Sequence, residues 1–287
     1  MNTSIDTVHR YVLGQIDIVE EWEPLAREGT DPEGVHKMRV AIRRTRTIVW
    51  TFREALPDDA GKHFVAELRW IARQLGQARD SDICAESFEQ YAARLQQEAT
   101  KEIEPFASFI RATRVEAYES VRAALSDERY TVLMEGLRDL TVNNPADAIE
   151  GSHGTRPIAA DDCLSIATAK VAEHGNRITT NSTAAELHKL RIKVKQLRYM
   201  LDFLAAHETS HIGRLAGITR ELQELLGKHQ DAITVQKALA AYEESSQARR
   251  VPVQESGLMK PFNQQLEAHI DECRRKFPEI WARWKFY

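Results

Sequence analysis

The stretch VHKMRVAIRRTRTIVWTF (Val35–Phe52) returns in the second half of the chain as LHKLRIKVKQLRYMLDFL (Leu187–Leu204). Apolar residues recur in both copies every three or four positions, which is the spacing of one face of an α-helix. Basic residues fill the neighbouring face: the twelve residues from His36 to Thr47 hold five lysines and arginines, one histidine and no carboxylate. Each copy therefore predicts a helix with a buried side and a cationic side.

A second block is also duplicated. RWIARQLGQARDSDI (Arg69–Ile83) matches RELQELLGKHQDAI (Arg220–Ile233), with an arginine at the start, a Leu-Gly pair in the middle and an aspartate near the end. Two blocks in the same order and at nearly the same separation indicate an internal duplication.

Helical periodicity extends over most of the chain, and helix-start signals fall at equivalent places in the two copies. Asp31 followed by Pro32 predicts an N-cap with proline in the first turn. Thr183 with Glu186 has the spacing of a capping box. Thr141–Asp162 is rich in Gly, Pro, Asn and Asp, as linkers are. We therefore expect a single all-α domain over residues 1–287, with helical repeat 1 at about 5–142, a linker at about 143–157 and helical repeat 2 at about 158–287.

The basic positions of each copy form a stripe beside the apolar face. In the first copy the stripe runs over about 15 Å from His36 to Arg46 and spans an arc of roughly 80°. It lacks the interleaved glutamates that neutralise an exposed helix. A solvated basic face paired with acidic helices is one interpretation; the repetition of the stripe in both halves favours an anionic ligand.

Bulk composition narrows the function classes. The net charge of −4 argues against a general nucleic-acid binder. The chain shows neither a signal-peptide pattern at its start nor an apolar run of the ~20 residues that cross a bilayer. Three widely spaced cysteines, Cys84, Cys163 and Cys273, fit neither a disulfide framework nor a zinc site. We expect a cytoplasmic protein with no membrane association and with reduced, buried thiols.

The histidines and aspartates of the two blocks give no catalytic pattern. His36 and His188 have Val40 and Ile192 one turn later, so each lacks a second metal ligand on its face. We interpret both as hydrogen-bonding or phosphate-contacting groups. The aspartates of the second block are expected to cap a helix or orient an arginine, because no nucleophile or metal ligands accompany them; these are Asp80 and Asp231.

The pattern His-x-x-Arg-x-x-x-Arg/Lys-x-x-Arg followed by Leu-Gly-x-x-x-Asp, present twice, resembles the CHAD family, the conserved histidine α-helical domain. The resemblance covers about Ile5 to Tyr287. It implies two helical bundles related by a pseudo-twofold axis, with basic helices lining a central groove or pore. It also implies binding of inorganic polyphosphate and association with polyphosphate granules. Many members are fused to a triphosphate-tunnel domain, and we expect a stand-alone version here, with no cofactor, no bound metal and no catalytic step.

Carried over residue by residue, the resemblance names the polyphosphate-binding positions. In the first copy they are His36, Lys37, Arg39, Arg43, Arg44, Arg46, Arg69, Arg73 and Arg79, with Asp80 as an orienting group. In the second they are His188, Lys189, Arg191, Lys195, Arg198 and Arg220, joined by Lys228, with Asp231 as an orienting group. A third wall is a weaker expectation, from Arg111, Arg114 and Arg122 on one face of a later helix.

The second copy departs from the first at three basic positions, where Gln196, Glu224 and Gln230 stand in place of Arg44, Arg73 and Arg79. We therefore expect the first copy to bind more strongly.

Three rival functions stay open at this point. Single-stranded nucleic acid would fit the charges but usually needs aromatic platforms, and the helical pattern places Trp50 and Phe52 on or near the apolar face. A kinase would need a glycine-rich phosphate loop, which is absent, and a metal-dependent hydrolase would need clustered carboxylates. Last, the stripes could be internal ion-pair networks. The oligomeric state is likewise left open.

Overall fold

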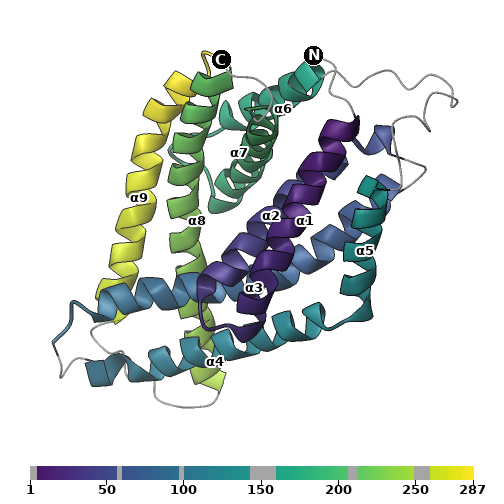
Figure 1. Ribbon diagram of the computed structural model, residues 1–287. Helices are drawn as coiled ribbons and strands as arrows, with labels where there is room; N and C mark the ends of the chain where they lie inside the picture. Colours follow the sequence, from purple (N-terminus) through teal and green to yellow (C-terminus); the bar gives the residue numbers. More distant parts are fainter. Residues whose placement is uncertain (1–4, 57–59, 97–99, 143–159, 206–211, 249–258) are drawn as a thin grey trace, which may run out of the picture.

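The computed structural model describes residues 5–56, 60–96, 100–142, 160–205, 212–248 and 259–287 (Figure 1). This part of the chain is built of α-helices and one short 3₁₀ helix, without a β-strand. The helices are α1 (Ile5–Glu28), α2 (Pro32–Thr51), η1 (Arg53–Ala55), α3 (Ala60–Ala92), α4 (Thr100–Leu125), α5 (Glu128–Val142), α6 (Ala160–Gly175), α7 (Ala184–Ala205), α8 (Ile212–Ala248) and α9 (Met259–Trp284). The predicted all-α class is thus confirmed.

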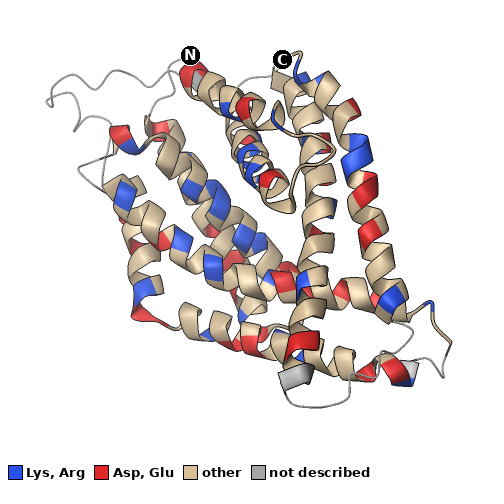
Figure 2. Cartoon of the chain, turned by 180° about the vertical axis from the view of Figure 1, so that it is seen from behind, with Lys and Arg blue, Asp and Glu red and all other residues tan. Residues whose placement is uncertain are grey.

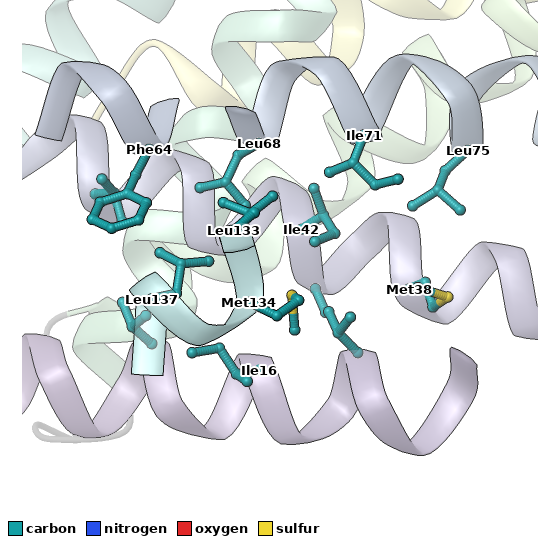
Figure 3. Close-up of a cluster of buried hydrophobic side chains, with 14 of the residues drawn as sticks. Ile16, Met38, Ile42, Phe64, Leu68, Ile71, Leu75, Leu133, Met134 and Leu137 are labelled. Carbon is teal, nitrogen blue, oxygen red and sulfur yellow. The ribbon is translucent and has the colours of Figure 1, made fainter. Parts of the chain in front are cut away.

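The first core lies among α1, α2, α3 and α5. Figure 3 shows Ile16 of α1, Ile42 of α2, Leu68 of α3 and Leu133 of α5 pointing toward one another, and each is at most 1% exposed. The apolar face predicted for Val35–Phe52 is therefore the face that α2 turns to this core. The expected N-cap is also present, since the Asp31 side chain accepts a hydrogen bond from the Glu33 backbone N–H.

The second core lies among α6, α7, α8 and α9. Leu190, Val194 and Leu197 of α7 are fully buried against Leu222 of α8. The capping box at the start of α7 forms as predicted: the Glu186 carboxylate accepts from the Thr183 backbone N–H at 2.7 Å. In return the Glu186 backbone N–H donates to the Thr183 hydroxyl.

A third core joins the two halves. It takes Phe88 from the C-terminal part of α3, Phe106 from the start of α4, Val235 from α8 and Phe262 from the start of α9. Phe88 and Phe106 meet edge to face with ring centroids 5.1 Å apart. Because α3 and α8 are long, with 33 and 37 residues, each contributes to its own half with one part and to the shared core with the other.

The halves also meet directly, with α3 against α8 and α2 against α7. This pairing joins equivalent helices of the duplication; the pseudo-twofold axis itself and the repeat boundaries stay predictions. The expected linker, about 143–157, lies outside the described residues. None of the described helices is long and apolar enough to cross a membrane.

Alanine substitutions at two glycines should change the stability in opposite directions, and they therefore test the packing. A methyl group on Gly175 would overlap the Trp281 indole, which is stacked between Phe277 and Trp284 and donates to the Asn176 side chain, so it has little room to move. Gly175→Ala should therefore destabilise the protein by about 1–3 kcal/mol.

Gly217 provides the matched control, because it lies inside α8 and a methyl group there would meet nothing within 4 Å. Gly217→Ala should stabilise the protein by about 0.5–1 kcal/mol through helix propensity. Urea unfolding followed by circular dichroism measures both. Equal effects of the two substitutions would contradict the packing of α6 against α9.

Candidate anion-binding site

Five basic side chains from both halves gather where α2 contacts α7, and we call them the central cationic cluster: Arg39, Arg43 and Arg46 from α2, Arg191 and Lys195 from α7. Figure 2 shows lysines and arginines recurring along these two helices, whose acidic residues are Glu33, Glu186 and Asp202, whereas the two signs of charge are more evenly mixed on α9. The predicted stripes of the two copies thus face a common region.

The cluster is held close together and is partly shielded from water. Burial, reinforced by the neighbouring Arg191, Arg43 and Arg39, lowers the pKa of Lys195 to about 6. Burial together with Arg43 lowers the pKa of Arg39 to about 10, so that this guanidinium still carries its charge at neutral pH. The Arg191 side chain is only 13% exposed, and burial lowers its pKa as well. Such like charges repel one another, and this geometry favours an anion beside them.

Some hydrogen-bonding capacity in the cluster is unused. The Nε atoms of Arg39 and Arg191 are buried and have no hydrogen-bond partner. Arg39 lies over α3 at Gly76, where a methyl group would stand 3.7 Å from that Nε. A buried donor without a partner is uncommon in folded proteins. The two atoms occupy equivalent positions of the duplication.

Two aspartates supply the nearby negative charge. Asp231 Oδ1 of α8 lies 4.0 Å from Arg191 Nη2, and Asp80 of α3 acts on both Arg39 and Arg191. Desolvation raises the pKa of each carboxyl group, and the surrounding cations oppose that rise. Both aspartates fall where their long helices pass from one core to the next: Leu75 and Ala78 precede Asp80 in the first core, and Cys84 follows it in the third.

Arg44 and Arg198 belong to a separate ion-paired group. Arg44 Nη2 lies 3.1 Å from Asp202 Oδ2, and Arg198 Nε lies 3.8 Å from the same oxygen. All three side chains are about a quarter exposed. The Arg44 guanidinium also lies 6.0 Å from the Tyr199 ring centroid. These two arginines therefore link α2 to α7 through a carboxylate that the sequence reasoning did not single out.

The histidines occupy equivalent places but have different partners. His188 Nδ1 lies 2.6 Å from Gln230 Oε1. In the first copy, Arg79 stands where Gln230 does, and burial and then the Arg79 charge lower the pKa of His36. The two histidines therefore have different neighbours: His36 is beside the Arg79 cation, and His188 is hydrogen-bonded to the Gln230 amide.

The remaining predicted residues lie at the margin. Lys37 pairs with Glu33 at 3.1 Å and lies over Trp22. Arg69 is close enough to Arg46 to lower its pKa, although burial lowers it more. The others are exposed and make no ion pair within the described part of the chain: Arg73, Lys189, Arg220 and Lys228.

The proposed third wall has other partners. Arg114 Nε donates to the buried Asp82 carboxylate at 2.9 Å and its Nη2 donates to the Gly29 carbonyl at 3.1 Å. Arg111 pairs with Glu104 on its own helix. Arg122 is exposed. Arg114 thus ties α4 to α3 and to the α1–α2 turn.

Tyr199 is a neighbour that sequence reasoning missed. It is 7% exposed and lies close enough to influence Arg39, Arg46 and Arg191. The signal in the sequence was a phenol directly after Arg198 in the second copy, where the first copy has Thr47.

The expectation for Trp50 was wrong. We expected Trp50 on or near the apolar face, but its side chain is 47% exposed, whereas Phe52 is buried as expected.

A cleft of about 760 Å³ opens beside the cluster, between α3, α8 and α9. Arg79 and Asp231 connect it to the cluster, and Lys228 and Lys276 line it further out. Its walls also carry Glu86, Glu221, Glu224 and Glu272, so its charge is mixed. Within the described residues, no three His, Cys, Asp or Glu side chains gather as a metal site. The central cluster is therefore the better site for an anion.

The three thiols are not activated. Cys84 and Cys273 are buried, and Cys163 is half-buried rather than buried as expected. Burial raises the pKa of Cys84 to about 12 and also raises those of Cys163 and Cys273. Protonated thiols are poor nucleophiles.

The all-α fold and the basic side chains on two duplicated helix pairs are the features expected of a CHAD domain. A family model confirms this assignment. The model for the CHAD domain matches residues 10–240. The chain belongs to the CHAD domain family.

Two curated relatives come from Mycobacterium tuberculosis, "Uncharacterized protein MT2285" (strain CDC 1551 / Oshkosh) and "Uncharacterized protein Rv2226" (strain ATCC 25618 / H37Rv), each 27% identical over 289 residues. The matches cover 94% of this chain and 54% of either relative, so the chain spans about half their length. Among solved structures, the CHAD domain of the plant Ricinus communis matches with TM-score 0.75 and 23% identity, over 98% of this chain and 91% of that one. PptA from Streptomyces chartreusis matches with TM-score 0.73 and 16% identity, over 98% and 100%. These structures share the fold.

Removing the two aspartates should expose the repulsion within the cluster. Desolvation outweighs the attraction of the cations and raises the pKa of both carboxyl groups. Asp80→Asn combined with Asp231→Asn therefore removes a desolvation cost together with that attraction, and the net change in stability at low salt should be small, within about 1 kcal/mol. The variant nevertheless leaves the repulsion among the cations without an opposing charge. Salt screens the repulsion. Melting temperatures in 20 mM and 500 mM NaCl should therefore differ more for this variant than for the parent protein.

The exposed pair Glu119→Gln and Glu135→Gln removes the same charge elsewhere and serves as the control. Equal salt dependence of both double variants would contradict the assigned role of Asp80 and Asp231.

Proposed function

We propose that this protein binds inorganic polyphosphate at the central cationic cluster, without a catalytic step. The observation that carries the proposal is the meeting of Arg39 and Arg43 with Arg191 and Lys195 from the other half, half-buried and short of negative charge. CHAD domains are associated with polyphosphate binding, which supports the choice of ligand.

Polyphosphate is a flexible linear polyanion without bases, so only charge, hydrogen bonds and groove shape can hold it. Arginine suits this ligand because its planar guanidinium offers paired N–H donors to phosphate oxygens. Release of counterions supplies much of the driving force for binding such a polymer, so affinity should fall steeply with salt.

The two halves would contribute unequally. In the first, Arg79 adds a cation beside His36, whereas in the second Gln230 adds a neutral amide beside His188. Arg44 and Arg198 would take part less, because Asp202 already neutralises them. We assign the ordering of the cluster to Asp80 and Asp231, and a peripheral role to the exposed Arg69, Arg73 and Lys228.

The rivals have less support. The CHAD family is generally a non-catalytic or binding family, and the thiols are protonated. Among the described residues, Trp50 is the exposed aromatic side chain near the cluster, whereas single-stranded nucleic acid is usually bound by several aromatic side chains on which successive bases stack. Internal pairing accounts for Arg44 and Arg198 but not for Lys195. Residence in the cytoplasm at polyphosphate granules is part of the same proposal.

Reversing charge inside the cluster should abolish binding. Arg39→Glu combined with Arg43→Glu should weaken the affinity for long-chain polyphosphate by at least a hundredfold, because two phosphate contacts become repulsive. Isothermal titration calorimetry at two salt concentrations measures this, and circular dichroism checks that helicity is intact. A DNA oligomer with the same number of phosphates as the polyphosphate should bind much more weakly.

Arg214→Glu with Arg275→Glu makes the same charge change on exposed parts of α8 and α9 and should leave most of the affinity. Retained binding by the Arg39/Arg43 variant would place the ligand elsewhere.

Lys195 should make binding depend on pH. Its pKa of about 6 leaves it mostly neutral at pH 7.5, because burial and the cations Arg39, Arg43 and Arg191 outweigh the attraction of Asp231. A bound polyanion stabilises the protonated form, so the complex should take up a proton, and affinity should rise as the pH falls from 8 toward 6. Titrations at pH 7.5 in Tris and in HEPES separate proton uptake from the binding enthalpy.

Lys195→Met should remove the uptake while keeping some binding through the arginines. The same proton uptake in the parent and in Lys195→Met would contradict this role of Lys195.

A further inference from the structure

We infer that a second ligand site lies outside the central cationic cluster and takes a mononucleotide, a planar aromatic base carrying phosphate. It is a cleft of about 260 Å³ between the end of α2, α6 and α7. This volume is slightly below the roughly 300–1,000 Å³ of pockets that enclose a whole drug-sized ligand. An open cleft of this size holds a base, with the phosphates at its rim.

The charges at this cleft favour an anion. Arg53, Lys170 and Lys193 line it, and none of the described residues that line it is a carboxylate. Two carboxylates lie close by: Glu54 is 2.9 Å from Arg53 Nη2, and Asp162 acts together with Glu54 on Cys163 of the cleft wall. Lys170 and Lys193 make no ion pair within the described part of the chain, so both ammonium groups are available to phosphate oxygens. The larger cleft between α3, α8 and α9, by contrast, is lined by several glutamates.

An aromatic platform stands beside these cations. Trp50 is 47% exposed and lines the cleft, together with Ile166, which is 55% exposed. The Arg53 guanidinium lies 4.2 Å from the Trp50 ring centroid and donates to the Trp50 carbonyl at 2.8 Å, which holds the ring against a fixed neighbour. A pre-ordered indole with free surface suits stacking of a nucleobase. Thr47, Thr51 and Gln196 add polar groups that can meet a base edge or a sugar.

The cleft and the cluster are on different sides of α7. At about 100° per residue, Lys193 lies roughly 200° around the helix from Lys195. On α2, Trp50 comes one turn after Arg46, at the end of the basic stripe. The two sites are thus near each other but use different side chains. This site does not depend on polyphosphate binding.

The probe is ADP labelled on its ribose with N-methylanthraniloyl, followed by fluorescence anisotropy with the full chain. Lys170→Gln with Lys193→Gln should weaken binding by at least tenfold, and Trp50→Leu should do so by about tenfold. The charge-matched control Lys101→Gln with Lys260→Gln, on α4 and α9, should bind normally. Unlabelled ADP should compete much better than tripolyphosphate, which lacks a base.

Polyphosphate titrations on the same variants separate the two sites. Lys170→Gln with Lys193→Gln should keep polyphosphate binding, and Arg39→Glu with Arg43→Glu should keep ADP binding. Three results would each overturn the inference: no ADP binding by the parent protein, loss of ADP binding only in the Arg39/Arg43 variant, or competition by tripolyphosphate as strong as by ADP. The first leaves the polyphosphate proposal untouched.

Discussion

The structure depends on holding like charges together. Arg39 and Arg43 of α2 stand beside Arg191 and the mostly neutral Lys195 of α7, and partial burial weakens the screening of the arginines' repulsion by water. Apolar packing supplies the force that opposes it: Ile42 anchors α2 in the first core and Val194 anchors α7 in the second. Asp80 and Asp231 offset part of the charge, and an anionic ligand would offset more.

The long helices α3 and α8 make this arrangement possible. Each starts in the core of its own half and ends in the third core, where Phe88 and Val235 pack with residues of α4 and α9. Asp80 and Asp231 stand where the cores change, so their side chains can turn to the cluster while the helix remains anchored on both sides. The length of α3 and α8 thus determines both the contact between the halves and the position of the two carboxylates.

Duplication has produced equivalent backbones with unequal chemistry. His36 faces the cation Arg79, whereas His188 bonds to the Gln230 amide. Asp202 occupies the second copy alone, since Ile48, Val49 and Trp50 stand where the second copy has Met200, Leu201 and Asp202. Trp50, at the end of the first stripe, likewise has an acidic counterpart in Asp202, and the cleft that we assign to a mononucleotide lies at this unmatched end.

The sequence alone determined the helices, their caps and the two stripes, because helix periodicity and capping depend on residues three or four positions apart. It also indicated the family through its paired motifs. Only the tertiary structure decided which charges are free: Arg44 and Arg198 share Asp202, Arg114 bonds to Asp82, and Lys195 is buried among arginines. The exposure of Trp50 was likewise decided by how α6 and α7 pack near the end of α2. Ion pairs and burial depend on helices that are far apart in the chain, and no spacing within one helix encodes which helix will lie opposite.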